Sequence, residues 1–146
     1  METWRLPYEH SKKKAKEIYK SIGAIICPAL DGDYVYFTNV GFNHLVRKGR
    51  IPRTKNEQMS RFVLLEHVEP ILKDPRANIE YRATTEKRVV NRHGEEYFME
   101  STAEFWTFHK RIDDCTIKVV VRKLGTEGDK HFFSIMGDNV VAENLY

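Results

Sequence analysis

A short basic segment, residues 41–53, holds the residues of this sequence whose types and spacing could do chemistry. It contains His44 together with the cations Arg47, Lys48, Arg50 and Arg53. Histidine can gain or lose a proton near neutral pH, and arginine and lysine can hold a phosphate group and stabilise charge that develops on it. This combination suits the cleavage of RNA without a metal ion. A solvated basic loop is the alternative interpretation of the same residues.

Metal-independent RNA cleavage needs few protein groups, because the ribose 2′-OH is itself the nucleophile. A base removes the proton of the 2′-OH, an acid protonates the leaving 5′-oxygen, and cations hold the phosphate. His44 is the first candidate for proton transfer, and Arg47 lies three residues further on, on the same face of an expected helix. His131, which follows Lys130, is the second candidate. The alternative for His44 is a helix-capping or packing role.

Later in the chain, four cations occupy strand positions that point to one face. Arg82 and Arg88 belong to one expected strand, and Lys118 and Arg122 to another. On the last expected strand, the hydroxyl of Ser134 could donate a hydrogen bond to the scissile phosphate. Taken singly, each of these residues also fits an ordinary solvated or small strand position.

The elements that must position these residues begin with helices. Apolar residues recur at helical spacing in residues 11–23 and in residues 55–73, where Pro70 predicts a kink or an end near Glu69. Between them, an Asp-Gly-Asp sequence at residues 31–33 predicts a hairpin turn. The basic segment is expected to form a short helix over residues 39–48.

From Ile79 onward the apolar pattern changes to a period of two, which is typical of strands with one exposed face. Strands are expected near residues 79–89, 97–109, 116–124 and 131–136. The order of elements predicts an α+β fold in which N-terminal helices pack on one face of an approximately four-stranded antiparallel sheet. The other face of the sheet should be open, polar and basic.

Length and composition indicate a single domain. The chain has 146 residues, 41% hydrophobic residues and a formal net charge of +3, which permits a polyanionic partner. We expect one domain over residues 1–141, made of a helix and hairpin in residues 1–40 and a core in residues 41–138. Residues 142–146 include Glu-Asn-Leu-Tyr, the start of a common protease-cleavage tag, and are interpreted as a tag remnant.

Metal, cofactor and membrane signals are not found in the sequence. Cys27 and Cys115 are too far apart for a metal knuckle and are interpreted as reduced residues of a cytoplasmic protein. Because there is no apolar run of about 18 residues, no membrane span is expected. We therefore expect no cofactor, no metal and no membrane partner.

The order of these features resembles a known family. The expected helix with His-Leu-Val-Arg is followed by ILKDPRANIEY, by strands that carry arginine, and by TIKVVVRKLGTEGDKHFFSIM. Over residues 41–138 this pattern resembles the barnase–EndoU–colicin–RelE fold, especially its phage and mobile-element branch. The resemblance implies a small metal-independent ribonuclease, often a toxin, with helices packed on a four-stranded antiparallel sheet.

The resemblance also assigns roles to individual residues. The family's helix histidine matches His44, and the cation that follows it matches Arg47 or Lys48. The basic residue of the first core strand matches Arg82 or Arg88, and the hydroxyl residue of the last strand, often threonine, matches Ser134. The chain departs from the family in lacking the second histidine that many members carry shortly after the first, and its first forty residues have no counterpart.

We therefore expect a toxin-like, metal-independent endoribonuclease that cleaves RNA, with tRNA as one candidate, to a 2′,3′-cyclic phosphate. It would act in the cytoplasm, either of its own cell or of a target cell into which it is delivered, and an acidic antitoxin or immunity protein would neutralise it. The alternative is a non-catalytic RNA- or protein-binding module on the same scaffold. An immunity-type protein is a third hypothesis, which the positive charge disfavours.

The predicted catalytic residues are His44, Arg47, Arg88, Lys118, His131 and Ser134. The predicted RNA-binding residues are Lys48, Arg50, Arg53, Arg82 and Arg122.

Overall fold

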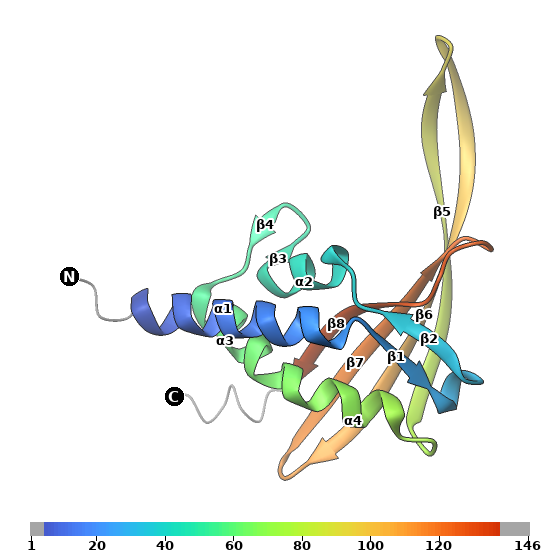
Figure 1. The fold of residues 1–146 in the computed structure, drawn as a ribbon. Helices are drawn as coiled ribbons and strands as arrows, with labels where there is room; N and C mark the ends of the chain where they lie inside the picture. Colours follow the sequence, from blue (N-terminus) through green and yellow to red (C-terminus); the bar gives the residue numbers. More distant parts are fainter. Residues whose placement is uncertain (1–4, 138–146) are drawn as a thin grey trace.

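A computed structural model of the chain describes residues 5–137, without the side chains of Arg5, Leu6, Glu86 and Arg88 (Figure 1). The helices are α1 (Arg5–Ile22), α2 (Asn39–Val46), α3 (Lys55–Leu64) and α4 (Val68–Lys73), with 3-10 turns η1 (Pro28–Leu30) and η2 (Leu65–His67). The main strands are β1 (Ala24–Cys27), β2 (Asp33–Tyr36), β5 (Asn78–Arg92), β6 (Glu95–Ile112), β7 (Cys115–Leu124) and β8 (His131–Gly137). A small hairpin consists of β3 (Arg47–Lys48) and β4 (Ile51–Pro52).

The fold is α+β, as predicted, but the prediction of a four-stranded antiparallel sheet was wrong. The main sheet has six strands in the order β1-β2-β8-β7-β6-β5. The meander from β5 to β8 is antiparallel, whereas β2 joins β8 in parallel through one residue pair, Tyr36 and His131. A parallel pair needs a long crossover connection, and the chain between β2 and β8 supplies it. The expected N-terminal hairpin thus forms, but it extends the sheet.

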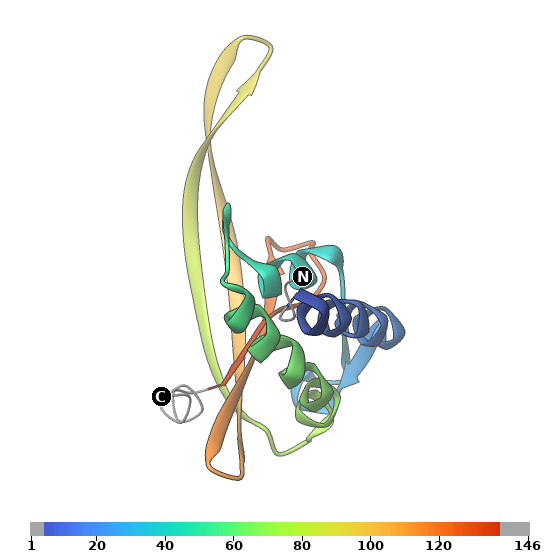
Figure 2. The ribbon, with the colours of Figure 1, turned by 90° about the vertical axis from the view of Figure 1, so that its left-hand side faces the viewer.

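The hairpin of β5 and β6 projects far beyond the rest of the sheet as a two-stranded arm (Figures 1 and 2). Pairing between β6 and β7 ends at Ala103 and Leu124, but β5 and β6 continue to pair as far as Arg92 and Glu95. The outer half of β5 was expected to be half-buried. In the structure Val89 is 55% exposed and Phe98 of β6 is 80% exposed, because no third strand or helix within residues 5–137 covers this part.

Helix ends differ from the predicted ones for local reasons. The second helix stops at Val46, and the next two residues form β3, so the basic segment is a helix followed by a small hairpin. The expected long helix over residues 55–73 is divided at Leu65–His67 rather than near Glu69. Pro70 lies in the first turn of α4, where its missing N–H breaks no intrahelical bond. The interruption therefore precedes the proline.

The core lies between the helices and one face of the sheet. Its largest fully buried side chains include Phe108, Phe132, Leu45 and Val119. Tyr19 of α1 joins the two layers, because its ring packs edge-on against Phe132 at 5.8 Å. No helix within residues 5–137 is long and apolar enough to cross a bilayer. The interpreted tag remnant, residues 142–146, lies outside the described residues.

Gly41 allows α2 to approach α1 and β8 closely. A Cβ atom at this position would lie 2.5 Å from the Phe132 carbonyl oxygen and 2.6 Å from Phe132 Cδ2, and closer still to the Tyr19 hydroxyl. Real Cβ atoms do not tolerate such distances, so α2 would have to move. Because α2 carries His44, this glycine controls the position of the candidate catalytic residue.

We predict that Gly41→Ala destabilises the protein by about 1–3 kcal/mol, the usual cost of overpacking a close contact. Chemical denaturation followed by circular dichroism measures this effect. At a helix position with free space, the same change would stabilise by about 0.5–1 kcal/mol, because alanine favours helix. A stabilised Gly41→Ala protein would therefore contradict the close approach of α2.

Candidate active site

His44 packs against Phe133, and this pair forms the centre of the candidate site. The two ring centroids are 4.4 Å apart. Phe133 lies at an irregularity of β8, where Phe132 pairs with Val121 while Ser134 pairs with Val120, so that Phe133 is an extra residue. Such a bulge re-aims a side chain. His44 and Phe133 line a surface hollow of about 530 Å³ together with Val40, Asn43, Arg47 and Gly49.

Arg53 holds the end of α2 that carries His44. Its Nε donates a hydrogen bond to the His44 carbonyl oxygen at 3.0 Å, and its Nη1 lies 2.7 Å from Glu57 Oε1. Only 6% of the Arg53 side chain is exposed. The buried Gln58 donates to the Arg53 carbonyl at 2.8 Å and accepts a hydrogen bond from Tyr8 of α1. Hydrogen bonds therefore hold both the backbone and the side chain of Arg53. Its observed contacts are structural, in contrast to the predicted contact with RNA.

Arg61 of α3 joins the same cluster and was not among the predicted site residues. Its Nη1 donates to the Ile135 carbonyl at 2.8 Å and to Ser134 Oγ at 3.3 Å, and its Nη2 lies 3.6 Å from Glu57 Oε1. The sequence does contain a signal for this residue. Arg61 lies three residues before Leu64, four before Leu65 and seven before Val68, so a charge falls on the apolar face of the helix.

Ser134 is buried and is not placed to contact a phosphate group in the hollow. Its side chain was predicted to donate to a bound phosphate, but Ser134 is 1% exposed and its hydroxyl accepts a hydrogen bond from Arg61. The prediction was wrong because α3 packs beside this part of β8 and covers it. In this structure Ser134 positions Arg61.

Arg122 and His131 form a pair beside Phe133. Arg122 Nε donates to His131 Nε2 at 3.0 Å, while His131 Nδ1 lies 3.4 Å from the Asp129 carbonyl. Burial, and then the charge of Arg122, lower the pKa of His131 below its ordinary value. This geometry requires a neutral imidazole that accepts from Arg122. His131 is therefore arranged to orient Arg122, and nothing in the arrangement favours the predicted proton-transfer role.

Arginines and aromatic rings alternate across the sheet next to His44. The Arg122 guanidinium carbon lies 4.3 Å from the centroid of the Phe133 ring, and that of Arg82 lies 4.6 Å from the centroid of the Phe105 ring. The two phenylalanine centroids are 5.8 Å apart. We call Arg82, Phe105, Arg122, Phe133 and His44 the cation–aromatic row. The expected basic face exists here, but it also contains the aromatic rings of Phe105 and Phe133.

The remaining predicted residues lie at different distances from the row. Arg47 lines the hollow, while Lys48 and Arg50 are exposed on the β3–β4 hairpin. Lys118 shares a sheet face with Arg122 but is four residues away along β7, or about 13 Å. Arg88 belongs to the arm, opposite Met99 and beyond the end of β7, and its side chain is not described. Lys118 and Arg88 are therefore not brought to His44.

The surroundings of His44 keep its imidazole neutral. Burial is the largest cause that lowers its pKa, to about 4, and the charges of Arg53, Arg61, Arg122 and Lys48 lower it further. Nδ1 is buried without a hydrogen-bond partner in the described part of the chain. Because Nδ1 is buried and His44 lines the hollow, Nε2 is the ring nitrogen that we expect to meet a ligand there. At neutral pH the ring can therefore accept a proton.

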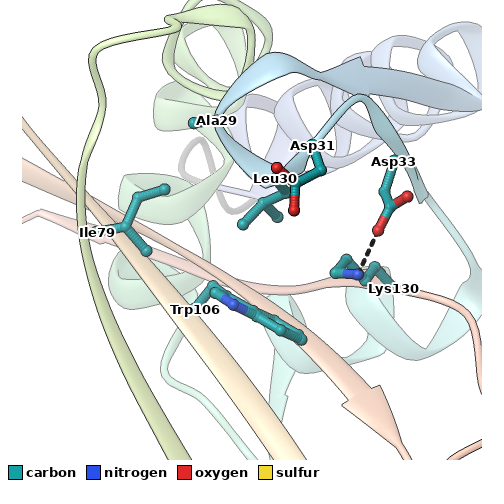
Figure 3. Close-up of a pocket in the computed structure, with 7 residues that line it drawn as sticks. All are labelled: Ala29, Leu30, Asp31, Asp33, Ile79, Trp106 and Lys130. Atoms are coloured by element: carbon teal, nitrogen blue, oxygen red, sulfur yellow. Dashed lines mark hydrogen bonds and ion pairs between the residues drawn. The ribbon is translucent and has the colours of Figure 1, made fainter.

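A second hollow, of about 310 Å³, lies on the opposite side of the sheet (Figure 3). Trp106 and Ile79 line it together with residues of the β1–β2 hairpin. Lys130 enters this hollow, 2.5 Å from Asp33 Oδ2 and 5.0 Å from the centroid of the Trp106 ring. Its charge is thus already paired. No group of three or more potential metal ligands occurs among the described residues.

Comparisons with protein-family models, with curated proteins and with solved structures find no match to this chain. The resemblance to the barnase–EndoU–colicin–RelE fold therefore rests on the sequence features quoted above.

We predict that His44 titrates near pH 4 and lowers the stability of the fold in acid. The folded-state pKa lies below the value of about 6.5 for an unfolded histidine, so the unfolded chain binds the proton more readily. The stabilising contribution is full above about pH 6.5 and is lost as the pH falls through 4. NMR titration of the His44 ring protons measures the pKa, and Arg53→Gln should raise it.

His44→Asn should remove this part of the pH dependence of unfolding. Replacement of the exposed His93 in the arm should leave the dependence unchanged. An ordinary His44 pKa near 6.5 would contradict the burial of this ring among arginines.

Proposed function

We propose that the protein is a metal-independent endoribonuclease in which His44 is the general base. The observation that carries this proposal is a neutral histidine surrounded by arginines at the edge of an open hollow. Because the arginine side chains are already held in position around the hollow, they favour the binding of a phosphate group in it. Phe133, which packs against His44 and also lines the hollow, offers an apolar ring surface to a nucleobase. A toxin-like role with an acidic neutralising partner agrees with this distribution of charge.

The reaction would proceed by attack of the ribose 2′-oxygen on the neighbouring phosphorus. His44 Nε2 takes the proton from the 2′-OH, the bond from O2′ to phosphorus forms, and the bond from phosphorus to O5′ breaks. The 5′-oxygen then takes a proton from water, and a 2′,3′-cyclic phosphate remains. Proton transfer to Nε2 requires the tautomer with hydrogen on Nδ1. When the phosphate binds, its negative charge offsets the arginine charges and makes His44 more basic.

The cations would act at different atoms. Arg122 is held by His131 and faces the same ring as His44, so it is placed to stabilise the developing charge on the phosphate. Arg47 lines the hollow and can contact a non-bridging oxygen. Arg53 and Arg61 are largely buried and hold His44 and the end of α3 in place. Their charges also contribute to the field in the hollow.

We predict that His44→Ala reduces RNA cleavage by about 10²–10⁴-fold, the usual contribution of a proton-transfer group. Purified protein would be incubated with total RNA and with tRNA in EDTA, and the products would be tested for 2′,3′-cyclic phosphate ends. His67→Ala is the matched control, because His67 lies in η2 and pairs with Glu66 away from the hollow.

Cleavage by the His44→Ala protein at the unchanged rate would remove His44 from the mechanism. Cleavage that stops in EDTA in the unaltered protein would contradict metal independence. Equal denaturation midpoints of the two variants are needed, so that loss of activity is separated from loss of the fold.

A non-catalytic RNA-binding module is the second candidate, and one observation favours it. His131 is engaged by Arg122 as a hydrogen-bond acceptor, so no second histidine is placed as a proton donor. The cation–aromatic row alone can bind single-stranded RNA, because arginines contact phosphates while aromatic rings stack on bases. This candidate requires binding without cleavage.

We predict that Phe133→Leu weakens binding of single-stranded RNA by about 1–3 kcal/mol for the base that stacks on this ring. Fluorescence anisotropy with a labelled oligonucleotide, over a series of salt concentrations, measures the affinity. Leucine keeps an apolar side chain at this position, so the loss reports on stacking. Phe98→Leu in the arm should bind as the unaltered protein does. A steep salt dependence with equal affinity for both variants would instead indicate contacts to phosphates alone.

A further inference from the structure

The outer edge of β5 is a long, unpaired strand edge. β5 has fifteen residues without proline or glycine and is the last strand of the sheet, with β6 as its one neighbour among the described residues. A strand edge presents a row of backbone N–H and C=O groups to any chain that can pair with it. Proteins commonly shorten or cover such edges, and no part of the chain within residues 5–137 shortens or covers β5 in this way.

The outer halves of β5 and β6 add exposed apolar residues to this edge. Val89 of β5 is 55% exposed, and Phe98, which is opposite Val89, is 80% exposed. A two-stranded ribbon of this kind is marginally stable in water without further strands or a packed face. The arm therefore exposes apolar residues of the kind that are usually buried in an interface with another chain.

We propose that β5 pairs antiparallel with β5 of a second copy of this chain, with the twofold axis at Thr84. The sequence around Thr84 supplies the argument. In this register Arg82 stands opposite Glu86 of the second copy, and Glu80 stands opposite Arg88. By symmetry each of these pairs of opposite charge occurs twice. Opposite charges on directly facing residues stabilise a strand pair, and like charges oppose it.

Neighbouring registers lack this complementarity. An axis one residue earlier, at Ala83, places Glu80 opposite Glu86, and an axis at Thr85 places Arg82 opposite Arg88. An axis at Glu86 places that glutamate opposite itself. The charges along β5 thus disfavour these neighbouring alignments and favour the alignment about Thr84. Charges that served only to keep the edge solvated would show no such preference for one alignment.

The same alignment would fill exposed apolar surface. It extends from Asn78 to Val90, and it places Val89 of the second copy opposite Ile79. Ile79 lines the second hollow with Ala29, Leu30 and Trp106 (Figure 3). The side chain of Val89 from the second copy would lie at the rim of this hollow, on the face that Ile79 occupies. Charge complementarity and apolar burial therefore both favour a second copy of this chain as the partner of β5. This pairing does not depend on any ribonuclease activity.

Sedimentation equilibrium of the full chain tests the proposal. We expect a dimer, and Glu86→Lys should weaken its association about tenfold or more, because two attractive pairs become repulsive. Arg82→Glu combined with Glu86→Lys should restore most of the affinity. Glu96→Lys makes the same charge change on β6, away from the free edge, and should leave the association unchanged.

Disulfide crosslinking tests the register. In a Cys115→Ser background, the Thr84→Cys protein treated with oxidised glutathione should form a covalent dimer, because the two positions face each other across the axis. Residue 85 of the two copies would be about 8 Å apart between Cα atoms, beyond the reach of a disulfide. Thr85→Cys should therefore crosslink much more slowly.

Three results would overturn the proposal. The first is a monomer at about 1 mM, where even a weak interface associates. The second is a dimer that responds equally to Glu86→Lys and Glu96→Lys. The third is equal crosslinking at positions 84 and 85. A monomer that forms a complex only with added RNA would assign the arm to nucleic acid instead.

Discussion

The close packing of α2 against α1 and β8 is the contact on which the candidate site depends. Tyr19 lies at its centre, where its ring contacts Phe37, Phe42 and Phe132 and its hydroxyl donates to the Thr38 carbonyl. Burial raises the pKa of Tyr19 well above its ordinary value, so the hydroxyl keeps its proton and the hydrogen bond persists. Because Gly41 adds no side chain at this point, the next turn of α2 brings His44 onto Phe133. The site is thus a consequence of packing among helices and the sheet.

Electrostatics at the site work against the fold and in favour of an anionic ligand. Arg53 and Arg61 are largely buried next to each other and share Glu57 as their carboxylate partner, which is itself partly exposed. Backbone carbonyls of His44 and Ile135 satisfy further donors. Burial and the neighbouring charge of Arg53 lower the pKa of Arg61, which is the expected sign for cations held close together. A group with negative charge would relieve this repulsion, which supports the proposal that an anionic ligand binds here.

Local sequence patterns predicted much of the secondary structure but less of its assembly. The period-two strands, the Asp-Gly turn and the amphipathic first helix follow from interactions between near neighbours, and each of them forms. The parallel contact of Tyr36 with His131 joins residues far apart in the chain, and no local pattern encodes it. The same holds for Ser134, whose burial depends on where α3 packs, and for the arginine–phenylalanine pairs, which depend on strand register. Arg61 was detectable in principle, because a charge on an apolar helix face needs a partner.

The proposed pairing of β5 edges bears on how the site would meet a long polymer. Residues that face each other across an antiparallel pair point to the same side of a sheet. A twofold axis through Thr84 is perpendicular to the sheet, so the cation–aromatic rows of both copies lie on one side of a continuous sheet. Arg82 belongs to that side and is two residues from the axis, which brings the two rows near each other at the centre of the dimer. A single strand of RNA could then contact both rows, whereas two separate monomers would each bind a short segment. The edge that makes the protein prone to self-association therefore also extends the surface available to its proposed ligand.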